Sequence, residues 1–169
     1  DDYDFIEDDR VNIALSGRQY LGDEFGSITD KSYTFNFPNL ITAQPVKLTV
    51  AVAATSRSSG STFIITSDGG ANSRSIYIPA DAEPYPDIYD VATRREQTLS
   101  FSNLSPSFSI NLNYDRNGDF NTKGWLDYLQ VNASSTLQYN NQPLYFRSFA
   151  SVGAGAISKF DIQNMNSNI

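Results

Sequence analysis

The sequence predicts an all-β protein, an antiparallel β-sandwich that is jelly-roll-like in its connections. Aromatic residues make up 13% of the 169 residues, with eleven Phe and ten Tyr against a single Met, and aromatic side chains favour pleated sheets over helices. Roughly nine or ten runs alternate apolar and polar residues at spacings of about 8 to 15 residues, which is the pattern of a sandwich or barrel. No fixed-period repeat and no β-α-β pattern is visible, which disfavours propellers, solenoids and parallel sheets.

The length predicts a single domain. Residues 1–30 are expected to form an acidic, mostly extended lead-in. Six of the first nine residues are Asp or Glu, and the apolar residues that follow keep no helical period before Ser16 and Gly17 interrupt them. Residues 31–169 are expected to form the β-sandwich.

Alternating runs predict four strands in the first half of the sandwich, at residues 32–37, 45–55, 62–66 and 74–79. In the second of these, "PVKLTVAVAAT", valines and a leucine fall on one face of a strand and small alanines on the other.

The second half begins with "ADAEPYPDIYD", which carries two prolines and is expected to form a loop. Six further alternating runs predict strands at residues 98–104, 107–114, 124–132, 135–140, 143–151 and 158–165.

The charge and the missing residue types exclude several classes of function. The net charge is −7 and the twelve Lys and Arg are scattered, which disfavours nucleic acid and anionic membranes as partners. No apolar run approaches 18 residues, so no membrane insertion is expected. Cys and His are both absent, which excludes Cys-His and Ser-His-Asp nucleophiles and zinc sites built on Cys or His. Carboxylate chemistry, calcium binding and recognition remain.

The segment "DRNGDF" is interpreted as a turn. Asp115, Asn117 and Asp119 stand at alternate positions, so they are weak candidates for a calcium site. An EF-hand loop needs Gly at its sixth position and Glu at its twelfth, and here these are Phe120 and Leu126. Asn-Gly between two alternating apolar runs is instead a leading signal of a type I′ hairpin. We therefore expect a hairpin and no cofactor, with calcium as the alternative.

Asp127 lies in the apolar segment "GWLDYLQVN", close to the only Trp of the chain, Trp125. Strand periodicity places both on one face together with two further apolar residues. A carboxylate on an apolar face is costly unless it is paired. Arg18 and Arg147 both lie in apolar surroundings and are the expected partners, so these four residues are predicted to be structural groups.

Two other classes of function stay open. A small carboxylate hydrolase needs a second acid a few ångströms from Asp127. The candidates for that acid are Asp23, Glu24, Asp115 and Asp119. A carbohydrate-binding sandwich module needs exposed rings on which sugars stack. The candidate rings are Trp125, Tyr20, Tyr85 and Tyr89.

Several motifs resemble the amino-terminal region of one family. "SGRQYLGDEF", "YTFNF" and "GWLDYLQVN", with "LYFRSF" and "FDI" behind them, are similar to the PorU sortases of the type IX secretion system, a family of gingipain-like cysteine peptidases of Bacteroidota. The resemblance runs from Tyr3 to the end of the chain, and "WLDY" and "SGR" are its most specific parts. The chain departs from the family at Tyr20, where Trp is usual, and near Ser135, where a basic residue is frequent.

The resemblance implies a non-catalytic domain of a larger cell-surface enzyme. Family members act at the outer face of the outer membrane, where they cleave a C-terminal sorting domain from secreted cargo and link the cargo to anionic lipopolysaccharide. Their catalytic Cys and His lie in a caspase-like domain that follows the matched region, so no catalytic residue carries over to this chain. The implied partners are the peptidase domain of the same polypeptide, other secretion-system proteins and cargo C-terminal domains.

Overall fold

The computed structural model describes residues 1–13, 20–57, 59–67, 72–81, 92–148 and 151–165. These residues contain no α-helix and nearly all of their strands pair antiparallel, so the predicted all-β sandwich is confirmed. The strands are β1 (Asp2–Glu7), β2 (Glu24–Phe25), β3 (Asp30–Asn36), β4 (Val46–Thr55), β5 (Ser61–Ser67), β6 (Ser73–Ile78), β7 (Thr93–Phe101), β8 (Ser107–Asp115), β9 (Lys123–Ala133), β10 (Leu137–Gln138) and β11 (Ile162–Gln163). No helix in this part of the chain is long and apolar enough to cross a membrane.

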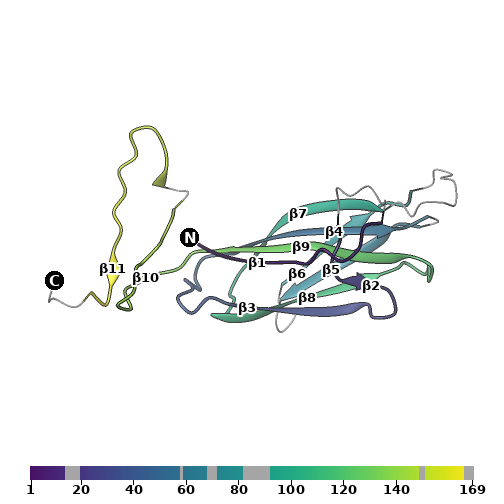
Figure 1. Ribbon diagram of the computed structural model, residues 1–169, viewed down its shortest axis with the longest axis horizontal. Coiled ribbons are helices and arrows are strands. Elements are labelled where there is room, and N and C mark those ends of the chain that lie inside the picture. The colour runs from purple at the N-terminus through teal and green to yellow at the C-terminus, as the bar shows by residue number, and fades with distance from the viewer. Residues whose placement is uncertain (14–19, 58, 68–71, 82–91, 149–150, 166–169) are drawn as a thin grey trace.

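Two sheets pack face to face (Figure 1). The larger sheet has the order β1-β9-β4-β7, and β2 pairs with β9 as well. The smaller sheet has the order β3-β8-β5-β6. From β3 to β9 the chain changes sheet at every connection except the β5–β6 hairpin, which is the crossing pattern of a jelly roll.

The core lies between the sheets and is dominated by alternating residues of the long strands. In β4, for example, Val46, Leu48, Val50 and Val52 are all buried in it. At one end the ring centroids of Phe63 and Tyr114 lie 4.7 Å apart. Gly124 of β9 makes room for these rings, because a Cβ atom there would lie 2.7 Å from Phe63 Cζ. A larger residue at position 124 would therefore displace the aromatic rings that pack between the two sheets.

The turn at Asn117 and Gly118 is confirmed, but the predicted hairpin is wrong. Both residues have positive φ (49° and 83°), and the amide of Asp119 donates to the carbonyl of Arg116 at 3.1 Å, as in a type I′ turn. The flanking strands β8 and β9 belong to different sheets. The turn therefore carries the chain across the sandwich, and a second turn that ends at Thr122 lengthens the connection.

The larger sheet begins earlier than the sequence pattern predicts. β1 and β2 both lie inside the segment expected as an extended lead-in. β1 pairs with β9 from Asp2↔Ala133 to Glu7↔Tyr128, and β2 pairs with Trp125 and Gly124. β9 is 11 residues long and pairs with β4 along one edge. Its other edge pairs with β1 and β2, which both come from the acidic N-terminal segment.

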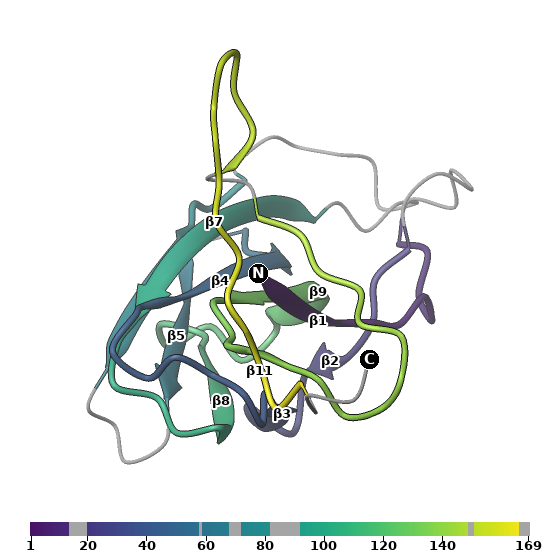
Figure 2. The same cartoon turned by 90° about the vertical axis from the view of Figure 1, so that its left-hand side faces the viewer.

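Residues 137–165, the C-terminal arm, project from one end of the sandwich (Figures 1 and 2). Two of the strands predicted here are reduced to a parallel two-residue ladder between β10 and β11. Residues 143–148 form no strand, although a strand was expected over 143–151. The described residues of the arm have no second layer of structure to bury their apolar side chains, so alternation alone does not produce a sheet.

Candidate functional site

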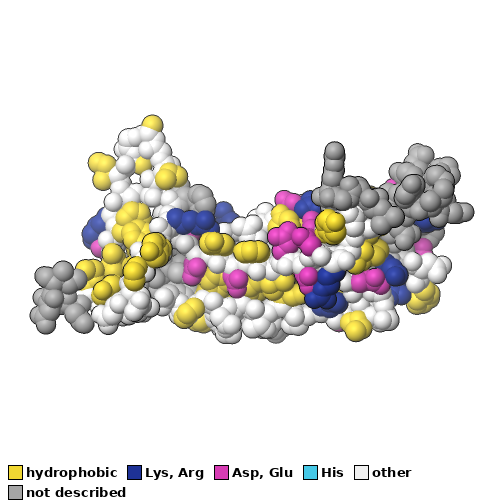
Figure 3. All heavy atoms as spheres, viewed as in Figure 1, with side chains coloured by type: hydrophobic (Ala, Val, Ile, Leu, Met, Phe, Trp, Pro, Cys, Tyr) yellow, Lys and Arg dark blue, Asp and Glu magenta, His cyan; other side chains and the backbone are white. Residues whose placement is uncertain are grey.

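The exposed side of the larger sheet, here called the outer face, presents a row of residues from each strand. The register across the sheet places four residues in one row, namely Glu7, Tyr128, Ala51 and Glu96. The next row on the same face lies two residues further along each strand and consists of Phe5, Gln130, Thr49 and Thr98. Several neighbours of these residues along the strands point into the core, among them Leu48, Val50 and Leu129. Space-filling atoms show apolar and acidic side chains gathered over β1 (Figure 3). The outer face is thus a mixed aromatic, amide and carboxylate surface.

Asp127 reaches this face because β9 has a β-bulge. Tyr128 pairs with Ala51 and Leu126 pairs with Val52, which leaves Asp127 as the extra residue. A bulge re-aims the side chains on either side of it. The expectation that Trp125 and Asp127 share a face with the apolar residues further along β9 is therefore wrong.

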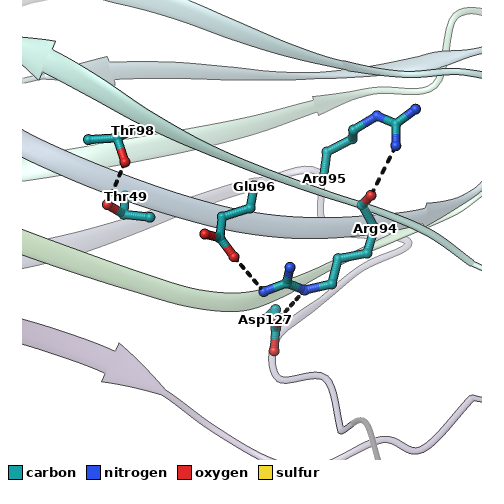
Figure 4. A network of polar contacts seen from close by, with 6 residues as sticks. All are labelled: Thr49, Arg94, Arg95, Glu96, Thr98 and Asp127. Atoms are coloured by element: carbon teal, nitrogen blue, oxygen red, sulfur yellow. Dashed lines mark hydrogen bonds and ion pairs between the residues drawn. The ribbon is translucent and has the colours of Figure 1, made fainter.

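Arg94 of β7 holds Asp127 in place. Arg94 Nε donates to Asp127 Oδ2 at 2.6 Å and Arg94 Nη2 donates to Glu96 Oε2 at 2.9 Å, so one guanidinium bridges two carboxylates (Figure 4). The side chain of Asp127 is 12% exposed and that of Arg94 is 34% exposed. The guanidinium also lies 5.9 Å from the ring centroid of Tyr128.

The pKa shifts follow from these contacts. Burial alone would lower the pKa of Arg94, but the hydrogen bonds to Asp127 and Glu96 outweigh it and raise the pKa. Hydrogen bonds from Arg94 and Tyr128 lower the pKa of Glu96. Burial, together with the bond to Glu96, raises the pKa of Tyr128. All three groups are held in their ordinary charge states at neutral pH.

The partner of Asp127 is therefore Arg94, and the prediction of Arg147 is corrected. Arg147 is exposed and its guanidinium lies 4.3 Å from the ring centroid of Tyr3, and Arg18 lies outside the described residues. Arg94 can cross β4 because Ala51 and Ala53 leave the path open. The small alanines of "VAVAAT" were the sequence signal for this contact.

Trp125 lies at one end of the outer face but does not contribute a surface ring. It is 4% exposed and packs with Leu21 and Ala53, and with the partly buried Ile13 and Ala92. Its indole Nε1 has no hydrogen-bond partner among the described residues. Leu21 and Ile13, which precede β2 in the chain, thus help to cover Trp125 and make it a packing residue.

The exposed rings of the outer face are ones that the sequence reasoning missed. Tyr3 is 51% exposed and Phe5 is 56% exposed. Together with Glu7, Tyr128 and Gln130 they line a hollow of about 310 Å³. The alternation "DYDFIE" was the available signal, but it lies in a segment interpreted as solvated because of its acids. Of the rings proposed from sequence, Tyr20 is 43% exposed, and Tyr85 and Tyr89 lie outside the described residues.

The acids proposed as a second carboxylate for Asp127 are engaged elsewhere. Asp23 accepts a hydrogen bond from Tyr33 Oη at 2.8 Å and an ion pair from Lys31 Nζ at 3.1 Å. Glu24 pairs with Lys123 at 3.1 Å. A glycosidase acid needs a raised pKa. Burial raises the pKa of Asp23, but the bonds from Tyr33 and Lys31 outweigh it and lower the pKa.

Asp115 and Asp119 shape the turn between β8 and β9. Asp115 Oδ1 accepts from the amide of Asn117 at 2.8 Å, and Asp119 Oδ1 accepts from the amide of Asn121 at 3.1 Å. Within the described parts of the chain, no three acidic, His or Cys side chains converge as a metal site would require. Calcium binding by Asp115, Asn117 and Asp119 stays a prediction.

Comparisons with known proteins place the fold beside two solved structures. No protein-family model matches the chain and no curated protein does. The chain is similar to dimeric latent PorU from Porphyromonas gingivalis, with a TM-score of 0.68 and 17% identity, over 89% of this chain and 14% of that chain. It is also similar to the CBM36-1 domain of a multidomain xylanase from the hindgut metagenome of Trinervitermes trinervoides, with a TM-score of 0.49 and 14% identity, over 80% of this chain and all of that one.

At 17% identity the first similarity concerns the fold alone. The chain has the fold of one part of PorU, and it spans a small share of the PorU chain. It contains no Cys and no His, so it cannot itself supply the nucleophile and base of a cysteine peptidase.

Proposed function

We propose that this chain is a non-catalytic β-sandwich domain of a PorU-like, gingipain-like cysteine peptidase of the type IX secretion system. In this proposal it lies at the bacterial cell surface. It packs there against the peptidase domain of the same polypeptide, against another secretion-system protein or against a cargo C-terminal domain. The observation that carries the proposal is the likeness of the whole sandwich to part of PorU, at a TM-score of 0.68 over 89% of the chain.

The geometry of the outer face supports a docking role over a catalytic one. The carboxylate of Asp127 is neutralised by Arg94, and Trp125 is a packing residue. What the outer face offers is a broad surface with exposed rings and charges, and such surfaces mark sites of protein contact.

The test is the coding DNA beyond Ile169 in the source organism. The proposal expects the reading frame to continue into a region with a Cys and a His that form a peptidase site. A stop codon soon after Ile169 would contradict it. If the frame continues, the amides of β1 and β9 should exchange with deuterium more slowly in the longer protein than in the 169-residue chain.

A carbohydrate-binding module is the second candidate. The observation in its favour is the hollow lined by Tyr3, Phe5 and Gln130, where rings stand beside an amide and a carboxylate. It predicts weak, Phe5-dependent retardation in affinity gels that contain a neutral polysaccharide. A chain that migrates equally with and without each polysaccharide would remove this candidate.

A further inference from the structure

The outer face repeats one arrangement, in which an aromatic ring and a neighbouring group bind an arginine. At one end the guanidinium of Arg94 lies over Tyr128 and bonds two carboxylates. At the other end the guanidinium of Arg147 lies over Tyr3 at 4.3 Å from the ring centroid. The carbonyl of Arg147 also accepts a bond from the amino group of Asp1 at 2.6 Å. Guanidinium groups are attracted by the negative face of an aromatic ring.

Between these two arginines lies another exposed ring, and a carboxylate stands beside it. Phe5 is 56% exposed and stands next to Tyr3 in the row of β1. Side chains two residues apart on a strand are separated by roughly 7 Å, which also places the carboxylate of Glu7 beside the Phe5 ring. Among the described residues, no arginine or lysine bonds to Glu7 and none lies over Phe5. The hollow of about 310 Å³ opens at this point.

The free edge of β1 does not offer a simple alternative mode of binding. β1 ends the larger sheet, so its outward backbone N–H groups face away from β9. The amide of Tyr3 donates to Asp2 Oδ1 and the amide of Phe5 donates to Asp4 Oδ1, both at 2.9 Å. A partner strand would have to displace both carboxylates. A partner is therefore expected to bind through side chains on the outer face.

We propose that the Phe5–Glu7 hollow binds an arginine side chain from an extended segment of a partner protein. The guanidinium stacks on Phe5, as that of Arg147 does on Tyr3, and forms an ion pair with Glu7, as that of Arg94 does with Asp127 and Glu96. Charge favours this occupant, because β1 contributes Asp2, Asp4 and Glu7 and the whole chain carries −7. The inference rests on the proposed function in one respect, namely that the occupant belongs to a protein.

The test uses the full 169-residue chain and a short peptide that alternates arginine and threonine, titrated at low salt by calorimetry. The matched probe is the same peptide with citrulline, which keeps the shape of arginine but is neutral. We expect the arginine peptide to bind and the citrulline peptide not to bind. Glu7→Gln and Phe5→Leu should each weaken binding about two- to fivefold, and the double variant about tenfold.

Two control variants separate the site from general attraction. Asp9→Asn removes the same charge two residues away from Glu7, and Phe120→Leu removes a ring that is 85% exposed in a turn. Both should bind the arginine peptide as the parent does, and thermal melts check that every variant is folded. Equal weakening by Glu7→Gln and Asp9→Asn would overturn the proposal, since binding would then depend on net charge alone.

Absence of arginine-peptide binding would also overturn the proposal of an arginine site. So would binding of a neutral xylo- or gluco-oligosaccharide that depends on Phe5 and occurs without peptide binding. The latter result would identify the hollow as a glycan site. The peptidase-domain proposal fails independently, because a reading frame that stops after Ile169 does not change the outcome of the peptide titration.

Discussion

At the scale of single residues, Asp127 illustrates how an acid is kept on a largely apolar strand. The bulge removes it from the pairing register, and the two outward alanines of β4 let Arg94 reach it from β7. The pair is only partly shielded, since a third of the Arg94 side chain is exposed. A half-buried, charge-assisted bond of this kind stabilises a fold less than a fully buried ion pair.

Replacing Asp127 with Ala should therefore lower the free energy of unfolding by about 1–3 kcal/mol, below the roughly 3–5 kcal/mol expected for breaking a fully buried pair. Arg94 keeps its bond to Glu96 and its access to water, which limits the loss. Urea unfolding of the parent and the variant measures the difference. The matched control is Glu96→Ala, which breaks the exposed half of the same bridge and should cost less than about 1 kcal/mol. Equal costs would show that Asp127 is no better shielded than Glu96.

Tyr33 and Asp23 form a second clasp, and its contribution should depend on pH. Burial and the bond to Asp23 raise the pKa of Tyr33. Because the pKa of Tyr33 is higher in the folded than in the unfolded state, the Tyr33 hydroxyl stabilises the fold fully below the pKa of unfolded Tyr, about 10. This stabilisation is lost as the pH rises beyond that value. The pKa of Asp23 is lowered despite its burial. The stabilisation of the fold by the Asp23 carboxylate is therefore complete above about pH 3.9 and is lost as the pH falls.

Tyr33→Phe should thus lower the free energy of unfolding by about 1 kcal/mol at pH 7. The difference in free energy of unfolding between parent and variant should become smaller above about pH 10. Unfolding by urea at pH 7 and at a pH above 10 measures both values. Tyr77→Phe on β6 is the control, because Tyr77 is 59% exposed and the loss of its hydroxyl should leave the free energy of unfolding at pH 7 unchanged. A gap that stays constant into the alkaline range would contradict the assigned role of the Tyr33 hydroxyl.

At the scale of elements, β1 is an exposed edge strand whose own acidic side chains oppose pairing with a further strand. The carboxylates of Asp2 and Asp4 bond the amides of the residues that follow them. These amides would otherwise point outward from the end of the sheet, and exposed edges pair readily with other chains. The acids of the N-terminus are thus part of the sheet and not only a solvated tail.

Replacing Asp2 and Asp4 together by Ala should promote self-association, since it exposes the amides of Tyr3 and Phe5 and removes two like charges. Sedimentation velocity across a concentration series measures this. The double Asn variant is the control: it loses the same charges but keeps two side-chain oxygens that accept hydrogen bonds. We expect the Asn variant to stay closer to the parent. Equal association of both variants would assign the effect to charge alone.

Most of the long strands could be predicted from sequence because each has one face in the core. β3, β4, β5, β6, β8 and β9 all overlap runs that alternate apolar and polar residues. β7 was predicted only from Thr98 onward, because residues 95–98 are all exposed. β1 could not be predicted in this way, because both of its faces are largely exposed and acids alternate with its rings. The Arg94–Asp127 pair was missed for a different reason: it joins β7 to β9 across β4, and a contact across an intervening strand depends on topology.

At the scale of the whole molecule, the chain consists of a closely packed sandwich and an arm with little core of its own. Every residue of the main core cluster lies at or before Ala133. In the arm, Tyr145 is 91% exposed and Ile157 is 99% exposed. Its internal contacts include the two-residue ladder of β10 and β11 and the ring pair of Phe146 and Phe160 at 4.9 Å.

The stability of the molecule should therefore survive removal of the arm. A chain that ends at Tyr139 loses the contact of Arg147 with Tyr3 but no residue of the main core, so we expect its melting temperature to fall by no more than about 4 °C, the equivalent of roughly 1 kcal/mol. Calorimetry of both chains measures this, and hydrogen exchange of the full chain should show slow amides in β4 and β9 and fast ones in residues 141–148. A fall of more than about 10 °C would mean that the arm stabilises the sandwich substantially. A small fall would show that the described residues of the arm contribute little to the stability of the sandwich, as the exposure of Tyr145 and Ile157 indicates.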